Sequence, residues 1–216
     1  MMKIESLNLG QPKRIEWRGK TVLTGIFKYP VDRSIYLGTE DVKNDSVVDR
    51  KYHGGIDKAC YSYSAEAYDF WKKLYPDSKF EYGFFGENLT VSQLNEIELK
   101  IGSQYRVGDA IIEVSQPREP CFKLGIRFGS QKILKPFINC NFPGAYFRVL
   151  KAGPVASNDQ LKLVFKDDKE LTVLQTYQLI YGLISDKRLA HQALKSDKLG
   201  HSAKKGIAKQ FNLNFQ

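Results

Sequence analysis

The sequence predicts a mainly β, mixed α+β fold, in which a β-barrel with a few short helices is followed by a small three-helix unit. Two observations lead to this prediction. In the first part of the chain, short apolar stretches alternate with turn residues, which is typical of a barrel or a strongly curved sheet. In the last fifty residues, apolar side chains recur at helical spacing instead. We therefore expect a β-barrel domain over residues 1–166 and a three-helix extension over residues 167–216.

The predicted strands begin close to the N-terminus. Leu9-Gly10-Gln11-Pro12 is a turn signal between Lys3–Asn8 and Lys13–Arg18, so these two segments are expected to pair as a hairpin. Gly108-Asp109 predicts a second hairpin turn between the two strand candidates beside it. The remaining strand candidates are Thr21–Phe27, Arg33–Leu37, Asn88–Val91, Ser103–Val107, Ala110–Ser115, Ala145–Leu150 and Leu161–Lys166.

Two helical segments interrupt the strands. Ser64 can cap a helix over Ala65–Tyr75, which a proline then ends. One or two short helices are expected within Lys123–Asn139, broken near Gly129 and Pro136. The first helix places three aromatic residues on one face, where core packing is the favoured role: Tyr68, Trp71 and Tyr75.

The last segment predicts three helices. Thr172 with Gln175 forms a capping-box pattern at the start of the first. Asp186 and Ser202 can cap the second and the third. The apolar residues at helical spacing are Val173, Tyr177, Ile180 and Ile184, then Leu189, Ala193 and Leu194, then Ile207 and Phe211.

Composition excludes several classes of protein. No apolar run approaches the ~20 residues of a membrane-spanning helix, and the N-terminal residues lack the pattern of a secretory signal. We therefore expect a cytoplasmic protein with no membrane partner, in which the three cysteines are reduced. The chain contains no C-x-x-C, G-x-G-x-x-G or P-loop pattern, so a zinc finger, an ordinary dinucleotide fold and an NTPase have no support.

Positive charge is concentrated in one segment. The formal net charge is +9, and an excess of this kind favours phosphates, an anionic cofactor or nucleic acid as partners. Residues 115–151 contribute most of the excess, although a solvated basic surface would give the same count. The basic residues of this segment are Arg118, Lys123, Arg127, Lys132, Lys135, Arg148 and Lys151.

Cys121 is the strongest candidate for chemistry in the segment. Pro117 and Pro120 keep the residues before it extended, so the thiol stands between a predicted strand and a predicted helix start. Arg118 and Lys123 flank it, and a cysteine near a helix N-terminus beside cations favours the thiolate. Thiolate is the form that binds a soft metal or attacks an electrophile. A small buried side chain fits the local sequence equally well.

Two glycine-rich loops are further candidates. His53-Gly54-Gly55 allows close approach of the backbone to a ligand, and with Arg50 it could bind an oxyanion or phosphate. An ordinary turn with a surface histidine is the alternative. Gly83-Phe84-Phe85-Gly86 leads to Asn88, whose amide could read the edge of a heterocycle. A tight corner before a strand is the alternative there.

Four motifs follow one another along the chain: Asp49-x-x-x-His53-Gly54-Gly55-x-Asp57-Lys58-Ala59, Gly83-x-x-Gly86-Glu87-Asn88-Leu89, Gln116-Pro117-Arg118-x-Pro120-Cys121-x-Lys123-Leu124 and Gly144-x-Tyr146-x-Arg148-Val149-x-x-x-Gly153. In this order they resemble the MOSC domain, the C-terminal domain superfamily of molybdenum cofactor sulfurase. The tail from Leu171 resembles the three-helix extension of the YiiM-like subfamily. The resemblance covers the chain from about Ile4 to Phe211.

The resemblance implies a barrel-like MOSC fold and a molybdenum cofactor of the molybdopterin type. It implies that one cysteine binds the metal, and this position maps to Cys121. His53 would bind the cofactor or relay a proton, since the unperturbed histidine pKa lies near neutral pH. The residues that would hold the cofactor are Arg50, His53, Gly54, Gly55, Lys58, Asn88, Arg118, Lys123, Arg127 and Arg148.

The resemblance also implies an activity. YiiM-like proteins are reductases of N-hydroxylated compounds, including N-hydroxylaminopurine-type base analogues, and take electrons from a separate flavoprotein reductase. A non-catalytic carrier of the molybdenum cofactor is the alternative, and a basic nucleic-acid-binding protein is a weaker one. No stable nucleic-acid partner is expected, and the sequence leaves a homodimer open.

Two positions need comment. The family has Gly-Asp before the His-Gly-Gly motif, and Asn44-Asp45 takes that place here. Asparagine tolerates a left-handed backbone, so the turn is expected to survive. Cys60 and Cys140 match no ligand position of the family and are expected to be structural.

Overall fold

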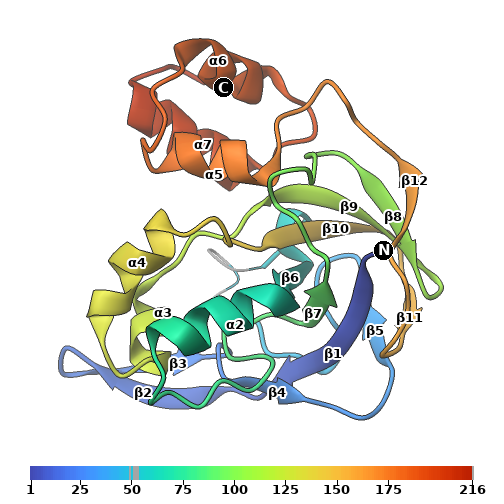
Figure 1. The fold of residues 1–216 in the computed structure, drawn as a ribbon, viewed down its shortest axis with the longest axis vertical. Coiled ribbons are helices and arrows are strands. Elements are labelled where there is room, and N and C mark those ends of the chain that lie inside the picture. The colour runs from blue at the N-terminus through green and yellow to red at the C-terminus, as the bar shows by residue number, and fades with distance from the viewer. Residues whose placement is uncertain (49, 51–53, 216) are drawn as a thin grey trace.

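The computed structural model of the chain describes residues 1–48, 50 and 54–215. It confirms a mixed α+β fold built on a curled eight-stranded sheet (Figure 1). The strands of this sheet, in spatial order, are β12 (Lys162–Phe165), β8 (Gln104–Val107), β9 (Ala110–Pro117), β10 (Ala145–Lys151), β6 (Cys60–Ser64), β7 (Leu89–Ser92), β1 (Lys3–Gly10) and β4 (Lys28–Pro30).

The sheet is antiparallel except between β6 and β7, which run parallel. Parallel neighbours need a crossover connection, and helix α2 (Ala65–Leu74) lies within it. At one end of the sheet, β1 also contacts a late part of the chain. The Ile4 amide donates to the Asp159 carbonyl (2.9 Å), and the Asn158 amide donates to the Ile4 carbonyl (2.8 Å). The N-terminus is thereby held against the segment that precedes β12.

Two smaller sheets complete the β structure. One pairs β11 (Gly153–Val155) with β5 (Ile35–Leu37), and the other pairs β2 (Lys13–Trp17) with β3 (Lys20–Thr24). The hairpin expected between the first two segments of the chain is therefore wrong. Arg18 and Gly19 both adopt positive φ (51° and 74°), which is the two-residue turn whose twist suits a hairpin, so β2 pairs forward with β3. β1 pairs with β4 and β7 instead. The hairpin predicted at Gly108 is confirmed, because β8 pairs with β9.

Helix α2 forms as the sequence predicts. The Ser64 side chain caps it by accepting a hydrogen bond from the Ala67 amide, and Tyr75 follows its last residue. Trp71 is fully buried and donates from Nε1 to the Tyr63 hydroxyl (2.6 Å). The aromatic face of this helix therefore packs into the core, as expected.

The residues after the Cys121 motif form α3 (Phe122–Arg127), the 3-10 helix η2 (Gln131–Ile133) and α4 (Leu134–Asn139). The predicted break at Gly129 is confirmed, where φ is 70°. The predicted break at Pro136 is wrong, because this proline lies in the first turn of α4, where its missing amide proton costs no hydrogen bond.

The C-terminal segment forms α5 (Val173–Ile180), α6 (Lys187–Lys195) and α7 (His201–Phe211). The capping box of α5 and the Asp186 cap of α6 are present. The Ser202 cap is wrong: α7 begins two residues earlier than that cap predicts, with Gly200 at its N-cap, and the Ser202 hydroxyl donates to Gln116 Oε1 of β9 (3.1 Å).

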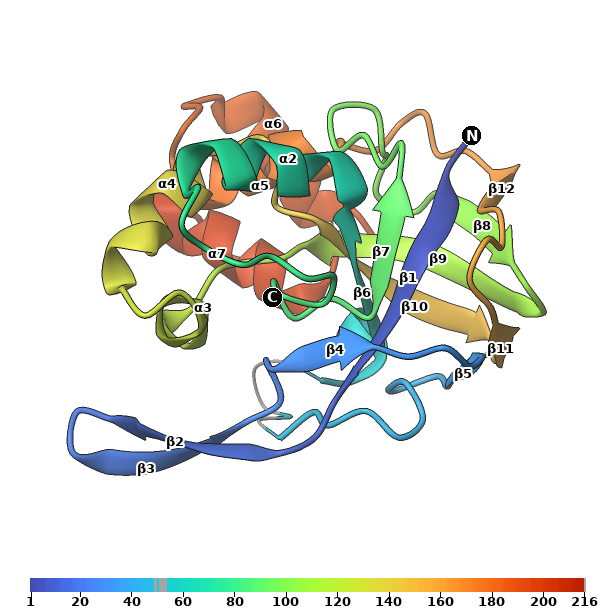
Figure 2. The same ribbon diagram turned by 60° about the horizontal axis from the view of Figure 1, so that its bottom comes forward.

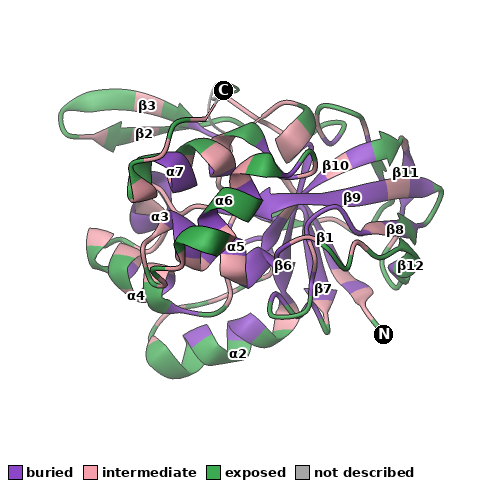
Figure 3. Cartoon of the chain, turned by 90° about the horizontal axis from the view of Figure 1, so that it is seen from above, coloured by how far each residue is buried: buried purple, intermediate pink, exposed green. Residues whose placement is uncertain are grey.

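The three C-terminal helices share one hydrophobic core with the sheet (Figure 3). α5 contacts β9, and buried residues of all three helices belong to the same cluster as the sheet residues. The helical members of that cluster include Val173, Leu179, Ala190, Ala203 and Ile207. Within the described residues, no helix has the length and apolar character needed to cross a membrane.

A buried glutamate makes the stability of the fold depend on pH. Burial raises the pKa of the Glu96 carboxyl group to about 8, although Oε1 accepts a hydrogen bond from the Gly144 amide (3.1 Å). Between the unfolded pKa of 4.5 and the folded value, the folded state binds more protons, so stability falls as pH rises. We expect Glu96→Gln to raise the free energy of unfolding at pH 8 by on the order of 2–4 kcal/mol.

Urea unfolding of the wild type and of Glu96→Gln at pH 5 and pH 8 checks this prediction. The two proteins should nearly coincide at pH 5 and separate at pH 8. Glu98→Gln is the matched control, because Glu98 is exposed and its replacement should leave the pH dependence unchanged. Equal pH dependence of the wild type and Glu96→Gln would contradict the prediction.

Candidate functional site

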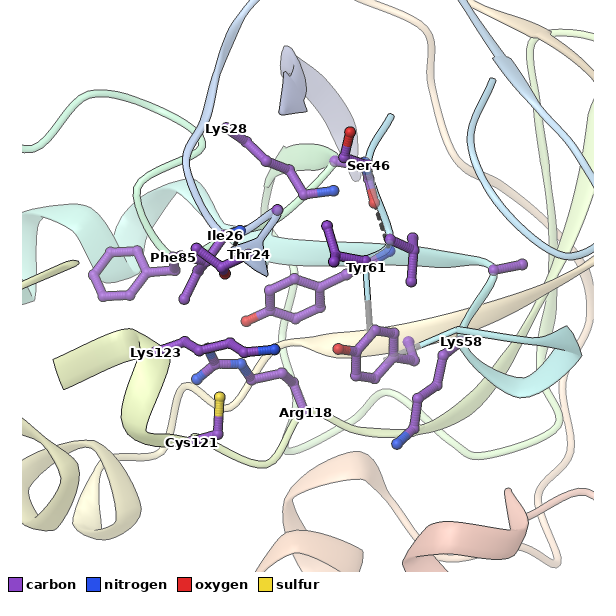
Figure 4. A pocket seen from close by; sticks show the side chains of 17 residues that line it. Thr24, Ile26, Lys28, Ser46, Lys58, Tyr61, Phe85, Arg118, Cys121 and Lys123 are labelled. Carbon is purple, nitrogen blue, oxygen red and sulfur yellow. Dashed lines mark hydrogen bonds between the residues drawn. The ribbon is translucent and has the colours of Figure 1, made fainter. Parts of the chain in front are cut away.

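A cavity of about 80 Å³ lies where the Cys121 loop meets the inner ends of several strands (Figure 4). Its walls come from segments far apart in the sequence: the β3–β4 connection, residues 46–48, the start of β6, the loop before β7, β10 and the loop after β9. Four basic side chains and one thiol line it: Lys28, Lys58, Arg118, Lys123 and Cys121. Aromatic and apolar walls come from Ile26, Tyr61, Phe85 and Tyr146.

Cys121 lies between the end of β9 and the start of α3. Its backbone is extended (φ −130°, ψ 173°), and it occupies the N-cap position of the short helix. Figure 4 shows its sulfur atom pointing toward the Arg118 and Lys123 side chains. The sequence predicted this environment, and the structure places all three residues in the cavity wall.

Arg118 is a buried cation beside the thiol. It is 5% exposed, and its guanidinium lies over the ring of Phe137 (5.1 Å to the centroid) and near that of Tyr61 (5.9 Å). Its Nη1 atom has no hydrogen-bond partner among the described residues. A buried donor of this kind costs free energy unless a ligand satisfies it, and an anion is the ligand that a guanidinium prefers.

Lys58 lies on the opposite wall, at the end of the 3-10 helix η1 (Ile56–Lys58). Burial lowers the pKa of its ammonium group, and the nearby carboxylates of Glu119 and Asp57 oppose that effect. Its Nζ atom lies 5.7 Å from the centroid of the Tyr146 ring. Lys58 is therefore a cation whose proton is held less tightly than that of an exposed lysine.

Lys28 is tied to a residue that the sequence analysis did not select. Its ammonium group forms a buried ion pair with Asp45 Oδ2, and Asn88 Nδ2 donates to the same oxygen (2.9 Å). The Gly10 amide donates to Asp45 Oδ1 (2.8 Å). Asn44 adopts φ 66°, as expected for a residue replacing glycine at this turn, and this aims Asp45 inward. The family's Gly-Asp pair was the only available signal for its importance.

Asn88 reaches the cavity wall, but its amide is already engaged. Besides the bond to Asp45, its Oδ1 accepts a hydrogen bond from the Tyr61 amide (3.3 Å). The loop before it turns at Gly83 and Gly86, which both have positive φ (86° and 84°). Asn88 therefore ties β6 and β7 to the Asp45 turn at the edge of the cavity.

The first glycine loop approaches the same cavity. Gly55 has φ 89°, and a Cβ atom at Gly54 would lie 3.0 Å from Val47 Cγ1 in the cavity wall. His53 lies outside the described residues, so its predicted role stays a prediction. Arg50 is exposed and pairs with Asp41 (2.8 Å) and Glu40 (3.2 Å), away from the cavity lining.

Two other predicted cofactor-binding arginines also lie outside the lining. Arg127 lies among the rings of Phe27, Tyr29 and Phe84, at 4.8–5.0 Å from their centroids. Arg148 Nε pairs with Asp57 (2.7 Å), and Arg148 Nη1 pairs with Glu113 (2.9 Å). Nη1 of Arg148 also donates to the Lys198 carbonyl (2.6 Å), so this side chain joins β10 to the loop before α7.

Arg148→Met is expected to weaken the fold. The substitution leaves the Asp57 and Glu113 carboxylates without their arginine and should cost about 2–4 kcal/mol. Urea unfolding of the wild type and the variant checks this prediction. Arg106→Met is the control, because Arg106 is exposed on β8. Equal stability of Arg148→Met and the wild type would contradict the prediction.

The other two cysteines lie inside the protein. Cys60 is fully buried on β6, and Cys140 is 6% exposed after α4. Burial raises the pKa of each thiol to about 12. Both positions are consistent with structural thiols rather than accessible metal ligands.

Comparison with known proteins identifies relatives that match most of the chain. The MOSC domain model matches residues 49–162. The chain is 36% identical to the uncharacterized protein YflK of Bacillus subtilis over 196 residues, covering 89% of this chain and 88% of YflK. It is 31% identical to protein YiiM of Escherichia coli, covering 83% and 80%. A Gibberella moniliformis protein named reductase is 30% identical over 165 residues, covering 75% of this chain and 29% of that longer protein.

Solved structures give the same result. The crystal structure of YiiM from Geobacillus stearothermophilus superposes with a TM-score of 0.81 at 29% identity, covering 98% of this chain and all of that one. YiiM from Escherichia coli superposes with a TM-score of 0.77 at 25% identity, covering 98% and 93%. Both matches extend through the three C-terminal helices.

Proposed function

This chain belongs to the MOSC domain family, and on that basis we propose that it is a molybdenum-cofactor-dependent reductase of N-hydroxylated compounds. N-hydroxylaminopurine-type base analogues are the preferred substrate class. The observation that carries the proposal is the pairing of the Cys121 thiol with the buried Arg118 cation in one cavity wall.

The residues of the cavity fit a molybdenum cofactor of the molybdopterin type. Cys121 offers the soft thiolate ligand that molybdenum takes, and the neighbouring cations suit an anionic cofactor with a terminal phosphate. The unpartnered Nη1 atom of Arg118 is the strongest single indication, since a buried guanidinium donor requires an acceptor that the described residues do not provide. Lys123 and Lys58 would add positive charge on either side.

The cofactor would supply the redox chemistry of the conversion R–NHOH + 2e⁻ + 2H⁺ → R–NH₂ + H₂O. The chain's own residues would bind and orient. Cys121 would hold the metal, and Arg118 would neutralise negative charge beside it. Lys58 Nζ, whose pKa is lowered by burial, would give a proton to the departing hydroxyl oxygen of the substrate, which then leaves as water. The rings of Tyr61 and Tyr146 would form a wall against which a planar heterocycle can lie.

Turnover with a small artificial donor tests the proposal. The purified holoprotein is mixed with dithionite-reduced methyl viologen and 6-N-hydroxylaminopurine, and formation of adenine is followed by chromatography. A reductase should oxidise two viologen radicals for each adenine formed. A cofactor carrier should bind molybdenum but form no adenine. A nucleic-acid-binding protein should instead show affinity for oligonucleotides that falls steeply with salt.

A further inference from the structure

We propose that the β2–β3 hairpin is the docking element for an acidic flavoprotein that delivers electrons to the thiol cavity. The inference rests on the proposed function, because the conversion consumes two electrons that the substrate does not supply. We call residues 13–24, which form β2, its turn and β3, the hairpin arm.

The hairpin arm extends beyond the main sheet (Figure 2). β2 and β3 form their own two-stranded sheet and, among the described strands, pair with no other. Most residues of the arm are exposed, including Leu23 at 42%. An isolated two-stranded hairpin is marginally stable in water, so this extension needs an explanation other than core formation.

The arm contacts the candidate site at both of its ends. Near the turn, the Trp17 ring stacks on the Phe122 ring, with centroids 5.1 Å apart and planes inclined by 25°. Phe122 directly follows Cys121. At the base of the arm, Thr24 lines the thiol cavity. A protein seated on the arm would therefore lie beside the cavity, which is the position that electron transfer into the cavity requires.

The arm also carries a concentrated positive charge. Lys13, Arg14, Arg18 and Lys20 are all exposed, and the one acid of the arm, Glu16, accepts a hydrogen bond from the Thr21 hydroxyl (2.7 Å). Lys13 lies over the Phe27 ring at 4.3 Å. A surface of this sign attracts an acidic partner and speeds its encounter in a salt-dependent way.

Charge alone would also suit nucleic acid, but the aromatic side chain of the arm favours a protein. Single-stranded nucleic acid binds on aromatic rings that are open to stacking with bases. Trp17 already stacks on Phe122, and Arg18 lies over the Trp17 ring at 5.4 Å. The arm therefore presents charges and backbone to a partner rather than a free ring.

The test compares two electron donors in the holoprotein. The probe is a purified flavodoxin, an acidic FMN protein, kept reduced by NADPH and its own reductase, and the comparison donor is reduced methyl viologen. The test variant is Arg14→Glu/Arg18→Glu/Lys20→Glu. The matched control is Lys187→Glu/Arg188→Glu/Lys195→Glu on α6, which lies at the opposite end of the molecule (Figure 1) and has the same resulting net charge.

We expect the arm variant to raise the KM for flavodoxin by on the order of tenfold and to flatten its salt dependence. Viologen-driven turnover should stay unchanged in both variants, which also shows that both fold. An unchanged flavodoxin KM in the arm variant, or an equal rise in the control, would overturn the proposal.

A direct measurement of flavodoxin binding tests the docking proposal even if the protein shows no turnover of N-hydroxylated compounds. Flavodoxin affinity is measured at low salt by calorimetry for the wild type and both variants. If the wild type reduces no N-hydroxylated compound but the arm variant alone loses flavodoxin affinity, the reductase proposal fails and the docking proposal stands. Loss of affinity for a single-stranded oligonucleotide, with unchanged flavodoxin affinity, would overturn the docking proposal and identify the arm as a nucleic-acid surface.

Discussion

Cys121→Ser is expected to lose its molybdenum and, with it, all viologen-driven turnover. At neutral pH the serine hydroxyl stays protonated and lacks the anionic sulfur that the proposed site offers to molybdenum. Elemental mass spectrometry gives molybdenum per chain after expression in a host that makes the cofactor. The wild type should approach one metal per chain, and the variant should contain almost none.

Two further variants act as controls for the thiol. Cys60→Ser and Cys140→Ser remove thiols that are buried at other places in the fold, so both should keep their molybdenum. Equal molybdenum in the wild type and Cys121→Ser would exclude Cys121 as the essential ligand. Metal loss in all three variants would point to a general loss of folding, which circular dichroism would reveal.

Asp45→Asn is expected to cost about 3–5 kcal/mol of stability. Its carboxylate is 1% exposed and receives hydrogen bonds from Lys28, Asn88 and the Gly10 amide. An amide at this position presents a donor toward one of these donors and leaves the buried Lys28 ammonium without its counter-ion. Urea unfolding at pH 7 measures the loss.

A double-mutant cycle separates the ion pair from the packing. Lys28→Met/Asp45→Asn removes both charges, so it should recover part of the stability that Asp45→Asn alone loses. The losses of unfolding free energy in Lys28→Met and Asp45→Asn are added and compared with the loss in the double variant. A loss in the double variant that equals or exceeds this sum would show that the ion pair does not act as argued. A loss below 1 kcal/mol in Asp45→Asn would contradict the prediction itself.

Features decided by neighbouring residues could be predicted from the sequence. Ser64 caps α2, and Thr172 with Gln175 forms the capping box of α5, because each bond joins residues only three apart. The first hairpin could not be predicted in the same way. Its turn depends on Arg18 taking a positive φ, which non-glycine residues seldom do, so the glycine at the end of β1 and the proline after it were the stronger local signal.

In the candidate site, too, residues that are close in sequence could be predicted, and residues whose partners are distant in sequence could not. Cys121, Arg118 and Lys123 lie in one contiguous motif, and all three line the cavity. An isolated arginine gives no such information, because its partners are distant in sequence. Arg148 pairs with Asp57, which is 91 residues away in the sequence. An arginine in this basic segment would have suited a phosphate equally well. Asp45 was overlooked for the same reason, since its three donors come from three separate segments.

The position of β1 has a consequence for how the protein is made. Ile4 of this strand forms hydrogen bonds with Asn158 and Asp159, and the strand also pairs with β7 and β4. β1 must therefore wait for about 155 more residues to be made, roughly 8–30 s at usual rates of synthesis, before it can complete its hydrogen bonds. Until then a strand with open edges, whose Ile4 and Leu7 side chains are not yet buried, is exposed to the cell, so nascent chains of this protein should be clients of ribosome-associated chaperones.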